Sequence, residues 1–509
     1  MKKRKNLVAA LLAGVLLSFT GLEAAGASLP DSFEDVEQGR FYYDAVYWAL
    51  ENGVTTGTSA TTFSPEEACT RAQTVAFLWR MAGEPEPENL DTGFEDVDSG
   101  RFYAKAVAWA VENGVTTGTT PTTFEPNGIC SRGEFVTFLY RAAGKPEANI
   151  YAMFTDVEEG RYYEKPVSWA VENGVTTGTT PVTFSPGDVC TRGHVVTFLY
   201  RWATGTKVKI VNVQDFGAVP GDDIDDTDAI QNAVNEEGAE MVYVPAGVYV
   251  VNAEPGIKLQ SNTNLVMDPE AVLEVKGNSQ DHYNVIRARN AANISIYGGQ
   301  IIGERDKHTG SEGEWGMGIG LYDCKNVTVA NVKISKNWGD GIYVGSTDDF
   351  GDDLYGCDNI KIMNCEIFEN RRSNISIVNA DNVTIDGCRI ADAGGHAPQC
   401  GINIEANTID GTVPDEAICR NIKISNTVVD VLGKGDVNGQ YFGFRTQRYH
   451  DRSTHTADNV IIENCTFNGD CGNYSGTNMT ISNTVIRGCF YDMQNTTLNN
   501  VSYEEIWRG

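Results

Sequence analysis

The stretch NIKIMNCEI at residues 359–367 recurs as NVTIDGCRI at residues 382–390, with asparagine first and apolar residues second, fourth and ninth. The same pattern begins at Asn326, Asn421, Asn459 and Asn478, so successive copies are 33, 23, 39, 38 and 19 residues apart. Alternation with a period of two puts side chains such as Ile360 and Ile362 on one face of a strand. Stacked copies can join these faces into a continuous core, so the pattern predicts a β-solenoid with loops inserted in some coils.

A second strand is expected in each coil, because pairs of apolar residues recur between the asparagine units. The pairs are Ile319 and Leu321, Ile342 and Val344, Ile375 and Ile377, Ile402 and Ile404, and Phe442 and Phe444. If these pairs point inward, the residues between and beside them point outward. The alignment then predicts one outward column of Tyr343, Ser376, Asn403 and Gly443, and a second of Gly345, Val378, Glu405 and Arg445. Arg372 and Asn374 flank these columns, and Glu405 and Arg445 are expected to be neighbours across one rung.

This outward face combines the groups that a sugar-binding groove uses: an aromatic ring, amides, a carboxylate and arginines. We expect Glu405, with Arg445 and Arg372, to carry any chemistry. Substrate contacts are expected from Tyr343, Asn374, Asn403, Arg448 and His450. An ordinary sheet surface can carry the same residues, in which case a Glu405–Arg445 salt bridge would only stabilise the coil.

The reaction stays open between two kinds of chemistry. Hydrolysis needs two carboxylates flanking the bond. Glu405 can pair with Asp340 or with an aspartate of the loop that follows the strand with Ile342 and Val344. Elimination or epimerisation at a uronic acid needs a base beside a neutralised carboxylate, with Arg372, Arg445, Arg448, His450 and His396 as the candidates. The loop aspartates Asp348, Asp349, Asp352 and Asp353 can hold calcium, although a solvated loop is the simpler interpretation, so no metal site is assigned.

The beginning of this region, residues 207–509, has its own motifs. It reads VQDFGAVPGD at 213–222, DTDAIQ at 226–231 and VPAGVY at 244–249, and Asp225 or Asp226 can cap a short helix there. This segment resembles the N-terminal cap of the rhamnogalacturonase and epimerase-like pectate lyase superfamily. The resemblance implies a right-handed parallel β-helix that acts on polysaccharide as a lyase, a hydrolase or a uronan epimerase. The paired-aspartate, Gly-His-Gly and Arg-x-Lys motifs of the family's hydrolases are not intact here, so a non-catalytic adhesin or envelope protein with a glycan-binding β-helix is the alternative.

The twelve cysteines follow the repeats instead of pairing within them, which predicts buried thiols. In the solenoid, Cys365, Cys388 and Cys465 share one inward position, and Cys324, Cys357 and Cys419 share the position before the asparagine. A bridge between Cys365 and Cys388 is the alternative if their coils are adjacent.

The N-terminal part contains three copies of another repeat, aligned at Phe33, Phe94 and Phe154 with periods of 61 and 60 residues. Each copy contains a tryptophan, then Gly-Val-Thr-Thr-Gly-Thr and Thr-Phe-(Ser/Glu)-Pro. Helical spacing predicts one helix that ends before Gly53 and a second that begins after Thr70, with matching helices in the other copies. Thr70 with Gln73 and Ser131 with Glu134 form capping boxes, whereas the third copy has His194 at this place.

These three copies resemble S-layer homology (SLH) repeats, with expected bounds of 28–86, 90–146 and 150–205. The resemblance implies binding of an acidic secondary cell-wall polymer through the [Thr/Ser]-Arg-[Ala/Gly] turn, which makes Arg71, Arg132 and Arg192 the candidate contacts. An arginine at the first helical position also lies beside free backbone N–H groups that can hold a carboxylate. Surface packing and pairing alone is the other interpretation of these arginines. The cysteines before this turn, Cys69, Cys130 and Cys190, are expected in the core.

Composition limits the location and the partners. Residues 1–27 have a basic start, an apolar run and small residues at Ala25 and Ala27, as in a cleaved signal peptide, and no later segment is apolar enough to span a membrane. A net charge of -30 argues against nucleic acid or anionic lipid as a partner. We therefore expect an exported bacterial surface protein whose partners are a wall polymer and an extracellular polysaccharide.

Overall fold

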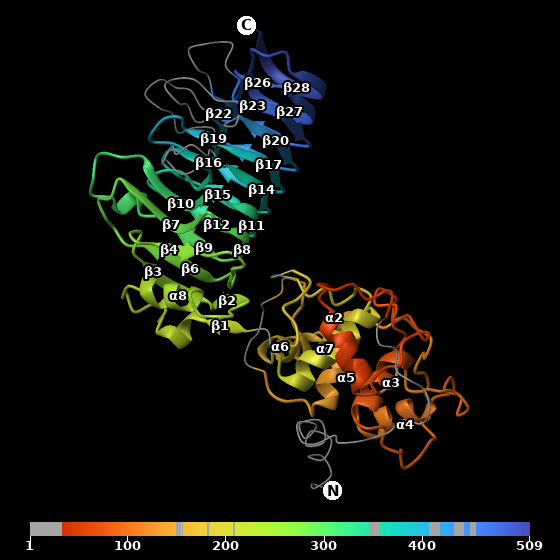
Figure 1. Ribbon diagram of the computed structural model, residues 1–509. Helices are drawn as coiled ribbons and strands as arrows, with labels where there is room; N and C mark the ends of the chain where they lie inside the picture. The colour runs from red at the N-terminus through yellow and green to blue at the C-terminus, as the bar shows by residue number, and fades with distance from the viewer. Residues whose placement is uncertain are drawn as a thin grey trace. The chain divides into compact units, whose positions relative to one another are not determined.

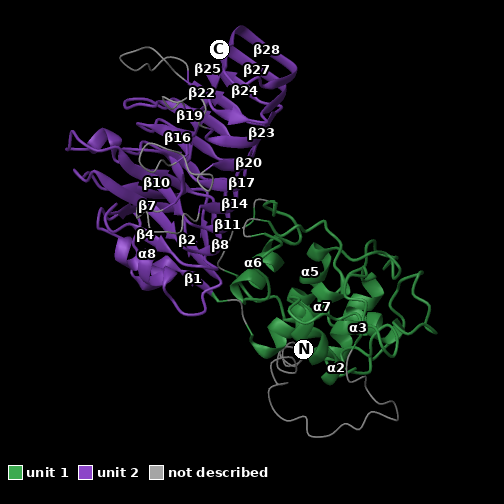
Figure 2. Cartoon of the chain, turned by 45° about the horizontal axis from the view of Figure 1, so that its top comes forward, with its two compact units in different colours: residues 1–209 green, residues 210–509 purple. Residues whose placement is uncertain are grey.

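The chain divides into two compact units that are described separately. The computed structural model (Figure 1) describes residues 33–148, 154, 156–180, 183–206, 209–346, 356–406, 418–431, 442–447 and 455–508. The units are Met1–Lys209 and Ile210–Gly509 (Figure 2). The expected signal peptide at 1–27 lies outside the described residues. None of the helices within the described ranges has both the length and the apolar character that crossing a membrane requires.

The first unit contains two helices from each of the three repeats. Their bounds are Tyr43–Glu51 (α2) and Arg71–Met81 (α3), Ala104–Glu112 (α4) and Arg132–Ala142 (α5), and Glu164–Glu172 (α6) and Arg192–Thr204 (α7). The second helix of each repeat packs against the first helix of the next repeat, as α3 on α4, α5 on α6, and α7 back on α2. The three repeats therefore close into a ring, and each depends on its neighbours for its packing.

Backbone hydrogen bonds between equivalent cysteines close the same ring. The N–H of Cys69 donates to the carbonyl of Cys190 at 3.0 Å, Cys130 to Cys69 at 2.9 Å, and Cys190 to Cys130 at 2.9 Å. All three side chains are fully buried, as expected, and their thiols are free. Small apolar side chains suit this position because the three backbone segments pair closely with one another here.

All three second helices begin with a capping box. Thr70 with Gln73 and Ser131 with Glu134 form the expected boxes. The third copy does not depart from this arrangement, because Nδ1 of His194 accepts from the backbone N–H of Thr191 at 3.4 Å. A neutral imidazole has one acceptor nitrogen, which here takes the place of the Glu or Gln oxygen.

The second unit is a solenoid of parallel strands, and its first coils are preceded by a short helix (Figure 1). That helix is α8 (Thr227–Val234), which follows a 3-10 turn, η2 (Val213–Phe216); a second turn, η3 (Arg305–Lys307), lies between coils. The Asp225 carboxylate accepts from the N–H of Thr227 at 3.0 Å and so caps α8. The Asp226 carboxylate accepts instead from the N–H groups of Val219 and Val250, which ties the cap to the first coils.

Among the described residues, the strands align as three parallel sheets that share one core, here named A, B and C. Sheet A contains β4 (Ile257–Leu259), β7 (His282–Arg289), β10 (Trp315–Tyr322), β13 (Ile342–Gly345), β16 (Ser373–Ile377), β19 (Cys400–Ile404), β22 (Phe442–Thr446) and β25 (Asp470–Asn473). Sheet B contains β1 (Ile210–Asn212), β2 (Met241–Val244), β5 (Asn264–Met267), β8 (Ala292–Tyr297), β11 (Lys325–Ala330), β14 (Cys357–Met363), β17 (Ala380–Asp386), β20 (Cys419–Ser425), β23 (Ala457–Glu463) and β26 (Gly476–Thr477). Sheet C contains β3 (Gly247–Val251), β6 (Ala271–Val275), β9 (Gln300–Ile302), β12 (Lys333–Ser335), β15 (Glu366–Phe368), β18 (Arg389–Ala391), β21 (Val428–Asp430) and β24 (Thr466–Asn468). The long strands β27 (Thr480–Asp492) and β28 (Thr497–Arg508) pair with each other and add to the ends of all three sheets.

The register in sheet B equals the spacing of the asparagine units. Val327 pairs with Ile360, Ile360 with Val383, Val383 with Ile422, and Ile422 with Val460. These side chains are at most 1% exposed and belong to one core cluster that runs through the unit. The sequence prediction of stacked coils with unequal loops is therefore confirmed. Cys324, Cys357, Cys365, Cys388, Cys419 and Cys465 are buried free thiols, also as predicted.

The structure explains why each unit begins with asparagine. Asn326 and Asn359 have φ of 56° and 55°, in the left-handed region that asparagine tolerates better than most residues. Their side chains also form a ladder, in which Asn359 Nδ2 donates to Asn326 Oδ1 at 2.9 Å and Asn326 Nδ2 to Asn293 Oδ1 at 3.0 Å. The asparagine therefore turns the chain between coils and joins successive turns.

Replacing Asn326 with alanine is expected to destabilise the solenoid by about 2 kcal/mol. The change places alanine in the left-handed region, which costs about 1 kcal/mol, and removes two exposed ladder bonds worth about 0.5 kcal/mol each. Asn326→Gly is the matched control, because glycine accepts the positive φ, and it should lose only about half as much. Urea unfolding with hydrogen exchange of β11 and β14 measures both effects, and equal losses in the two variants would contradict the backbone contribution.

Candidate functional site

The expected register of sheet A is confirmed over most of its length and is wrong at its last step. Ile342 pairs with Ile375 and Ile375 with Ile402, as predicted. In β22, however, Ile402 pairs with Phe444, whereas the sequence alignment had matched it with Phe442. Thr446 is the buried partner of Ile404, whereas Phe442 packs with Arg445 and Tyr491 in a pocket, so apolar character does not mark the inward pair of β22. A slip of two residues keeps every side chain on its own face, and periodicity alone does not detect it.

The correction moves two residues of the predicted columns. Arg445 lies opposite Asn403, not opposite Glu405, and Gly443 leaves the column. The observed outward column consists of Tyr343, Ser376, Asn403, Arg445, Gly472, Tyr491 and Trp507. Glu405 follows the end of β19, and its N–H donates to the carbonyl of Ile377. The carboxylate and the arginine therefore lie on the same face but are not direct neighbours.

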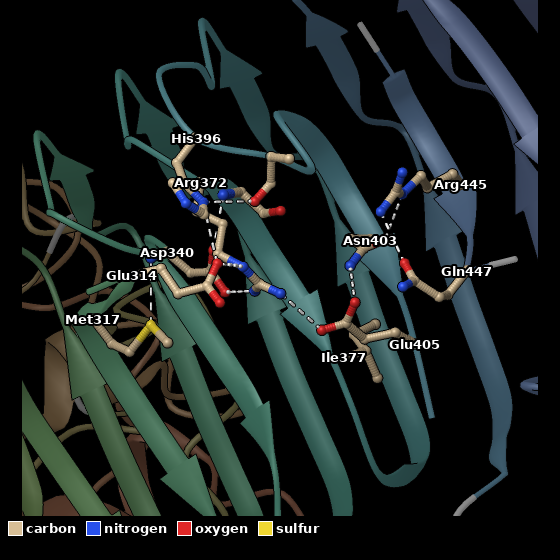
Figure 3. A network of polar contacts seen from close by, with 12 residues as sticks. Glu314, Met317, Asp340, Arg372, Ile377, His396, Asn403, Glu405, Arg445 and Gln447 are labelled. Atoms are coloured by element: carbon tan, nitrogen blue, oxygen red, sulfur yellow. Dashed lines mark hydrogen bonds and ion pairs between the residues drawn. The ribbon is translucent and has the colours of Figure 1, made fainter. Parts of the chain in front are cut away.

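Arg372 is the centre of a charged cluster on this face (Figure 3). Its Nη1 lies 2.9 Å from Asp340 Oδ2, its Nη2 lies 3.0 Å from Glu405 Oε1, and its Nε lies 3.3 Å from Glu314 Oε2. Asp340 and Arg372 precede β13 and β16, Glu314 precedes β10, and Glu405 follows β19, so neighbouring coils bring the four together. Glu314 is a site residue that the sequence analysis missed, because it lies in a loop outside both repeated strand patterns.

Burial and the neighbouring charges together set the pKa values in this cluster. The Asp340 side chain is fully buried, and its Oδ1 accepts from the N–H of Ser373 at 2.8 Å. Burial raises the pKa of Asp340, and the neighbouring Arg372 opposes this effect. Burial lowers the pKa of Arg372, but the charges of Asp340 and Glu405 outweigh it and the net pKa is raised. Arg372 is thus a fixed cation that holds three carboxylates in place.

Glu405 is connected to Arg445 through Asn403 (Figure 3). Asn403 Nδ2 donates to Glu405 Oε2 at 2.8 Å, and Arg445 Nε donates to Asn403 Oδ1 at 2.9 Å. Arg445 Nη2 continues the chain to Gln447 Oε1 at 2.8 Å. The Glu405 side chain remains 15% exposed, so both its oxygens are oriented while one edge reaches solvent. This is the geometry of a positioned acid or base.

His396 adds an exposed titratable group to the edge of the cluster. Its Nδ1 lies 3.1 Å from Glu314 Oε2, and its side chain is 42% exposed. The N–H of His396 donates to the carbonyl of Arg371, which fixes the backbone beside Arg372. Asp340, considered from sequence as the second carboxylate for hydrolysis, and His396, considered for elimination or epimerisation, therefore lie in the same cluster as Glu405.

Two other predicted substrate contacts, Tyr343 and Asn374, lie in different environments. Tyr343 is 8% exposed and packs with Tyr322, Met317 and Val378 on the face of sheet A. Asn374 is fully buried, with Nδ2 on the carbonyl of Ala391 and Oδ1 accepting from Asn370, so it does not flank the column as an exposed amide. Asn374 lies within β16, and these two hydrogen bonds hold its side chain in the interior of the coil.

Several predicted residues cannot be placed. Arg448 and His450 lie outside the described residues, as do the candidate calcium ligands Asp348, Asp349, Asp352 and Asp353. In the part of the chain that is described, no group of three or more His, Cys, Asp or Glu side chains is arranged to hold a metal ion. The guanidinium of Arg372 takes the cationic position among its three carboxylates.

The three SLH arginines begin their helices as expected, but their environment differs from the expectation. The backbone N–H of Arg71 donates to the backbone carbonyl of Gly128. The N–H groups of Arg132 and Arg192 donate to the backbone carbonyls of Asp188 and Glu67, respectively. The helix N-termini are therefore not free to hold an anion, because carbonyls of the next repeat occupy them. Each arginine Nε also donates to a phenylalanine carbonyl of the next repeat, at 2.8–2.9 Å.

The surroundings of these three arginines are not equivalent. Arg71 Nη1 forms an ion pair with Glu134 at 2.5 Å. Arg132 and Arg192 are 2% and 5% exposed, and the Nη2 of each has no hydrogen-bond partner among the described residues. Burial and the nearby Arg132 lower the pKa of His194 to about 4, so this residue is neutral near pH 7. Two of the three arginines thus have unused donors and no anionic partner of the kind that Glu134 gives Arg71.

Comparisons with known proteins agree with both parts of the chain. Residues 32–75, 93–136 and 154–196 match the S-layer homology domain, and residues 210–431 match the family "Rhamnogalacturonase A/epimerase, pectate lyase-like". Uncharacterized protein YclG of Bacillus subtilis (strain 168) is 35% identical over 44% of this chain and 44% of its own length. The Surface-layer 125 kDa protein of Lysinibacillus sphaericus is 26% identical over 59% of this chain and 26% of its own length.

Among solved structures, the tailspike protein gp49 from Acinetobacter baumannii bacteriophage Fri1, a capsular polysaccharide depolymerase, is 16% identical, with a TM-score of 0.40 over 58% of this chain and 57% of that one. The chain spans less than half the length of the curated relatives YclG and YorA, at 44% and 39%. The family matches and the strand pairing agree on the architecture. The chain therefore contains three S-layer homology domains, which indicate an exported cell-surface protein, followed by a β-helix whose residues 210–431 match the rhamnogalacturonase A/epimerase, pectate lyase-like family.

Proposed function

We propose that the β-helix binds an extracellular polysaccharide along sheet A and that Glu405 acts on it as an acid or base, while the SLH domains hold the protein to an acidic wall polymer. The observation that carries the proposal is Arg372 with Glu314, Asp340 and Glu405 on adjacent coils. Ion pairs on an exposed surface contribute little to stability. Burying charged side chains together costs desolvation free energy, and such groups are characteristic of functional sites.

The roles within the cluster follow from burial. Asp340 is fully enclosed, so it fixes Arg372 and does not reach a substrate. Glu405 is the carboxylate with both oxygens oriented and one edge open, and Glu314 with His396 lies at the exposed edge. A polysaccharide lying across the coils would meet Glu405 first, with Arg445 on the next rung.

Arg445 favours an acidic sugar as the substrate. Its hydrogen bonds among the described residues go to the neutral amides Asn403 and Gln447, so no described carboxylate neutralises it. It can therefore meet a uronate carboxylate while Glu405 takes the proton from the adjacent carbon. Breaking the bond to the glycosidic oxygen, which leaves as the hydroxyl of the departing sugar after taking a proton from Glu405 or water, then gives an unsaturated end. Return of a proton from water to the opposite face of the same carbon gives the epimer instead. Hydrolysis would instead pair Glu405 with a second carboxylate and water.

Glu405→Gln is expected to reduce turnover of the accepted polysaccharide by about a hundredfold or more, the usual contribution of a general acid or base. The full chain and the variant are incubated with polygalacturonate, rhamnogalacturonan, alginate and host glycans. Ultraviolet absorbance of unsaturated ends, reducing ends and the proton NMR of the uronates distinguish elimination, hydrolysis and epimerisation.

Glu463→Gln is the matched control, because Glu463 also forms an ion pair, with Lys423 at 2.7 Å, but on sheet B. In Glu405→Gln the new side-chain NH2 group can face Asn403 Nδ2, which donates to Glu405 Oε2 in the wild type. Hydrogen exchange of β19 therefore checks that the variant keeps its fold. Full turnover in a folded Glu405→Gln protein would refute the assignment.

A second candidate function is glycan binding without catalysis. It is favoured by the small exposed fraction of Glu405 and by the engagement of its two oxygens with Arg372 and Asn403, as in a structural ion pair. An adhesin or envelope protein would bind one of these polysaccharides and release no product from it.

A further inference from the structure

A pocket lies on sheet A beside the charged cluster, at the last coils of the β-helix. It has a volume of about 450 Å³, and its lining includes Phe442, Arg445, Gln447, Tyr474, Tyr491 and Trp507. Arg445 and Gln447 also end the hydrogen-bonded chain that begins at Glu405. The pocket is thus continuous with the cluster, but four aromatic rings make its chemistry different.

The outward column of sheet A creates this pocket. Arg445 pairs with Gly472, Gly472 with Tyr491, and Tyr491 with Trp507, so glycine leaves room for another ring between an arginine and two large rings. A Cβ at Gly472 would collide with the ring of Tyr474, which shows that this ring lies over the glycine. The rings of Tyr474 and Tyr491 are 6.1 Å apart and nearly parallel, at 19°.

The lining combines apolar ring faces with polar groups on one side. Phe442 meets the rings of Tyr474 and Tyr491 edge-on, at 6.1 and 6.2 Å between centroids. Trp507 is 53% exposed and lines the pocket, so part of its ring is accessible to a ligand. Aromatic platforms with a few convergent polar groups suit ligands that have an apolar face and a polar rim, which describes a pyranose ring.

We propose that this pocket is a second sugar subsite, which stacks a pyranose of an acidic polysaccharide on Tyr491 and Trp507, beside the sugar whose carboxylate Arg445 meets. The proposal rests on the proposed function and extends it, because it sets the direction of the bound chain. Tyr491 lies three rungs from Asn403, or about 14 Å at about 4.8 Å per rung. The polysaccharide would therefore run parallel to the solenoid axis, with the subsite and Glu405 contacting different sugars of one chain.

The test measures binding by the full chain to polygalacturonate, alginate and a neutral galactan, using affinity electrophoresis and the fluorescence of wild type minus that of Trp507→Phe. Trp507→Ala and Tyr491→Ala are expected to weaken binding of the accepted acidic polymer about tenfold or more, as for a dominant aromatic contact. Tyr503→Ala is the matched control, since Tyr503 lies on β28 and is 38% exposed but is outside the pocket lining. Its affinity should equal that of wild type, and a ligand should change the fluorescence of Trp507.

The outcomes separate this proposal from the catalytic one. Equal affinity of wild type and both pocket variants would overturn the subsite and leave the role of Glu405 standing. Binding that depends on the pocket, without any product, would support the subsite and refute catalysis. Failure of wild type to bind any polysaccharide would overturn both, and equal affinity for neutral and acidic polymers would overturn the assignment to an acidic sugar.

Discussion

Arg372→Met should destabilise the β-helix by about 3–5 kcal/mol and abolish any activity that depends on Glu405. The change leaves the fully buried Asp340 carboxylate without the guanidinium that lies 2.9 Å away, and a lone buried charge costs about that much. It also releases Glu405 from its contact at 3.0 Å. Hydrogen exchange of β13, β16 and β19 in the full chain, together with urea unfolding, measures the loss.

A compensating variant makes this result specific to the ion pair. Arg372→Met combined with Asp340→Asn removes both buried charges and should recover at least half of the lost stability, while turnover remains lost. Arg389→Met is the matched control, because Arg389 is an exposed arginine on β18 and its replacement should change stability by less than about 0.5 kcal/mol. A loss below about 1 kcal/mol in Arg372→Met would contradict the electrostatic account of the cluster.

The second large effect concerns the wall polymer. The double variant Arg132→Gln and Arg192→Gln is expected to reduce cosedimentation with purified acidic wall polymer by about a hundredfold or more. Each of these buried arginines has an unpartnered Nη2 among the described residues, and a hydrogen bond to a charged group is worth about 1.5–3 kcal/mol. Two such contacts together give about 3 kcal/mol or more.

Arg71→Gln is the matched control for the same experiment. Arg71 has the same place in the first repeat, but Glu134 already pairs with it at 2.5 Å, so its loss should weaken polymer binding by much less. Thermal unfolding of all variants is needed, because each arginine also bonds to a phenylalanine carbonyl of the next repeat. Arg132→Lys and Arg192→Lys keep the charge in case the glutamine variants do not fold. Equal losses of polymer binding in Arg71→Gln and the double variant would refute the proposed difference between Arg71 and the other two arginines.

The candidate site could be predicted from sequence only in part. The period-two pattern placed Tyr343, Ser376 and Asn403 in one column, and the structure confirms it. The same pattern misplaced Arg445 by one pair, because Thr446 fills an inward position that sequence assigns to an apolar residue. Glu314 could not be found, since it precedes β10 in an irregular loop that has no periodicity to align.

The SLH unit shows the same limit at the level of repeats. The helix starts, the first two capping boxes and the arginines at the first helical position follow from local spacing along the chain, whereas the box with His194 does not. The closed ring that joins Arg192 of the last repeat to Phe63 of the first does not, because this contact spans 129 residues. Nor does local spacing show that Glu134 neutralises one arginine, whereas the Nη2 atoms of the other two have no partner among the described residues.

The sequence by itself determined the two architectures, the spacing of the coils and the face on which each strand residue lies, because these depend on periodicity and on short-range backbone preferences. Only the tertiary structure decided which charges meet: Arg372 with three carboxylates, Asn403 between Glu405 and Arg445, and four aromatic rings around one pocket. Those contacts depend on the register between coils and on loop conformation. A shift of two residues in the pairing of neighbouring strands leaves a pattern with a period of two unchanged. The same shift changes which side chains are close together.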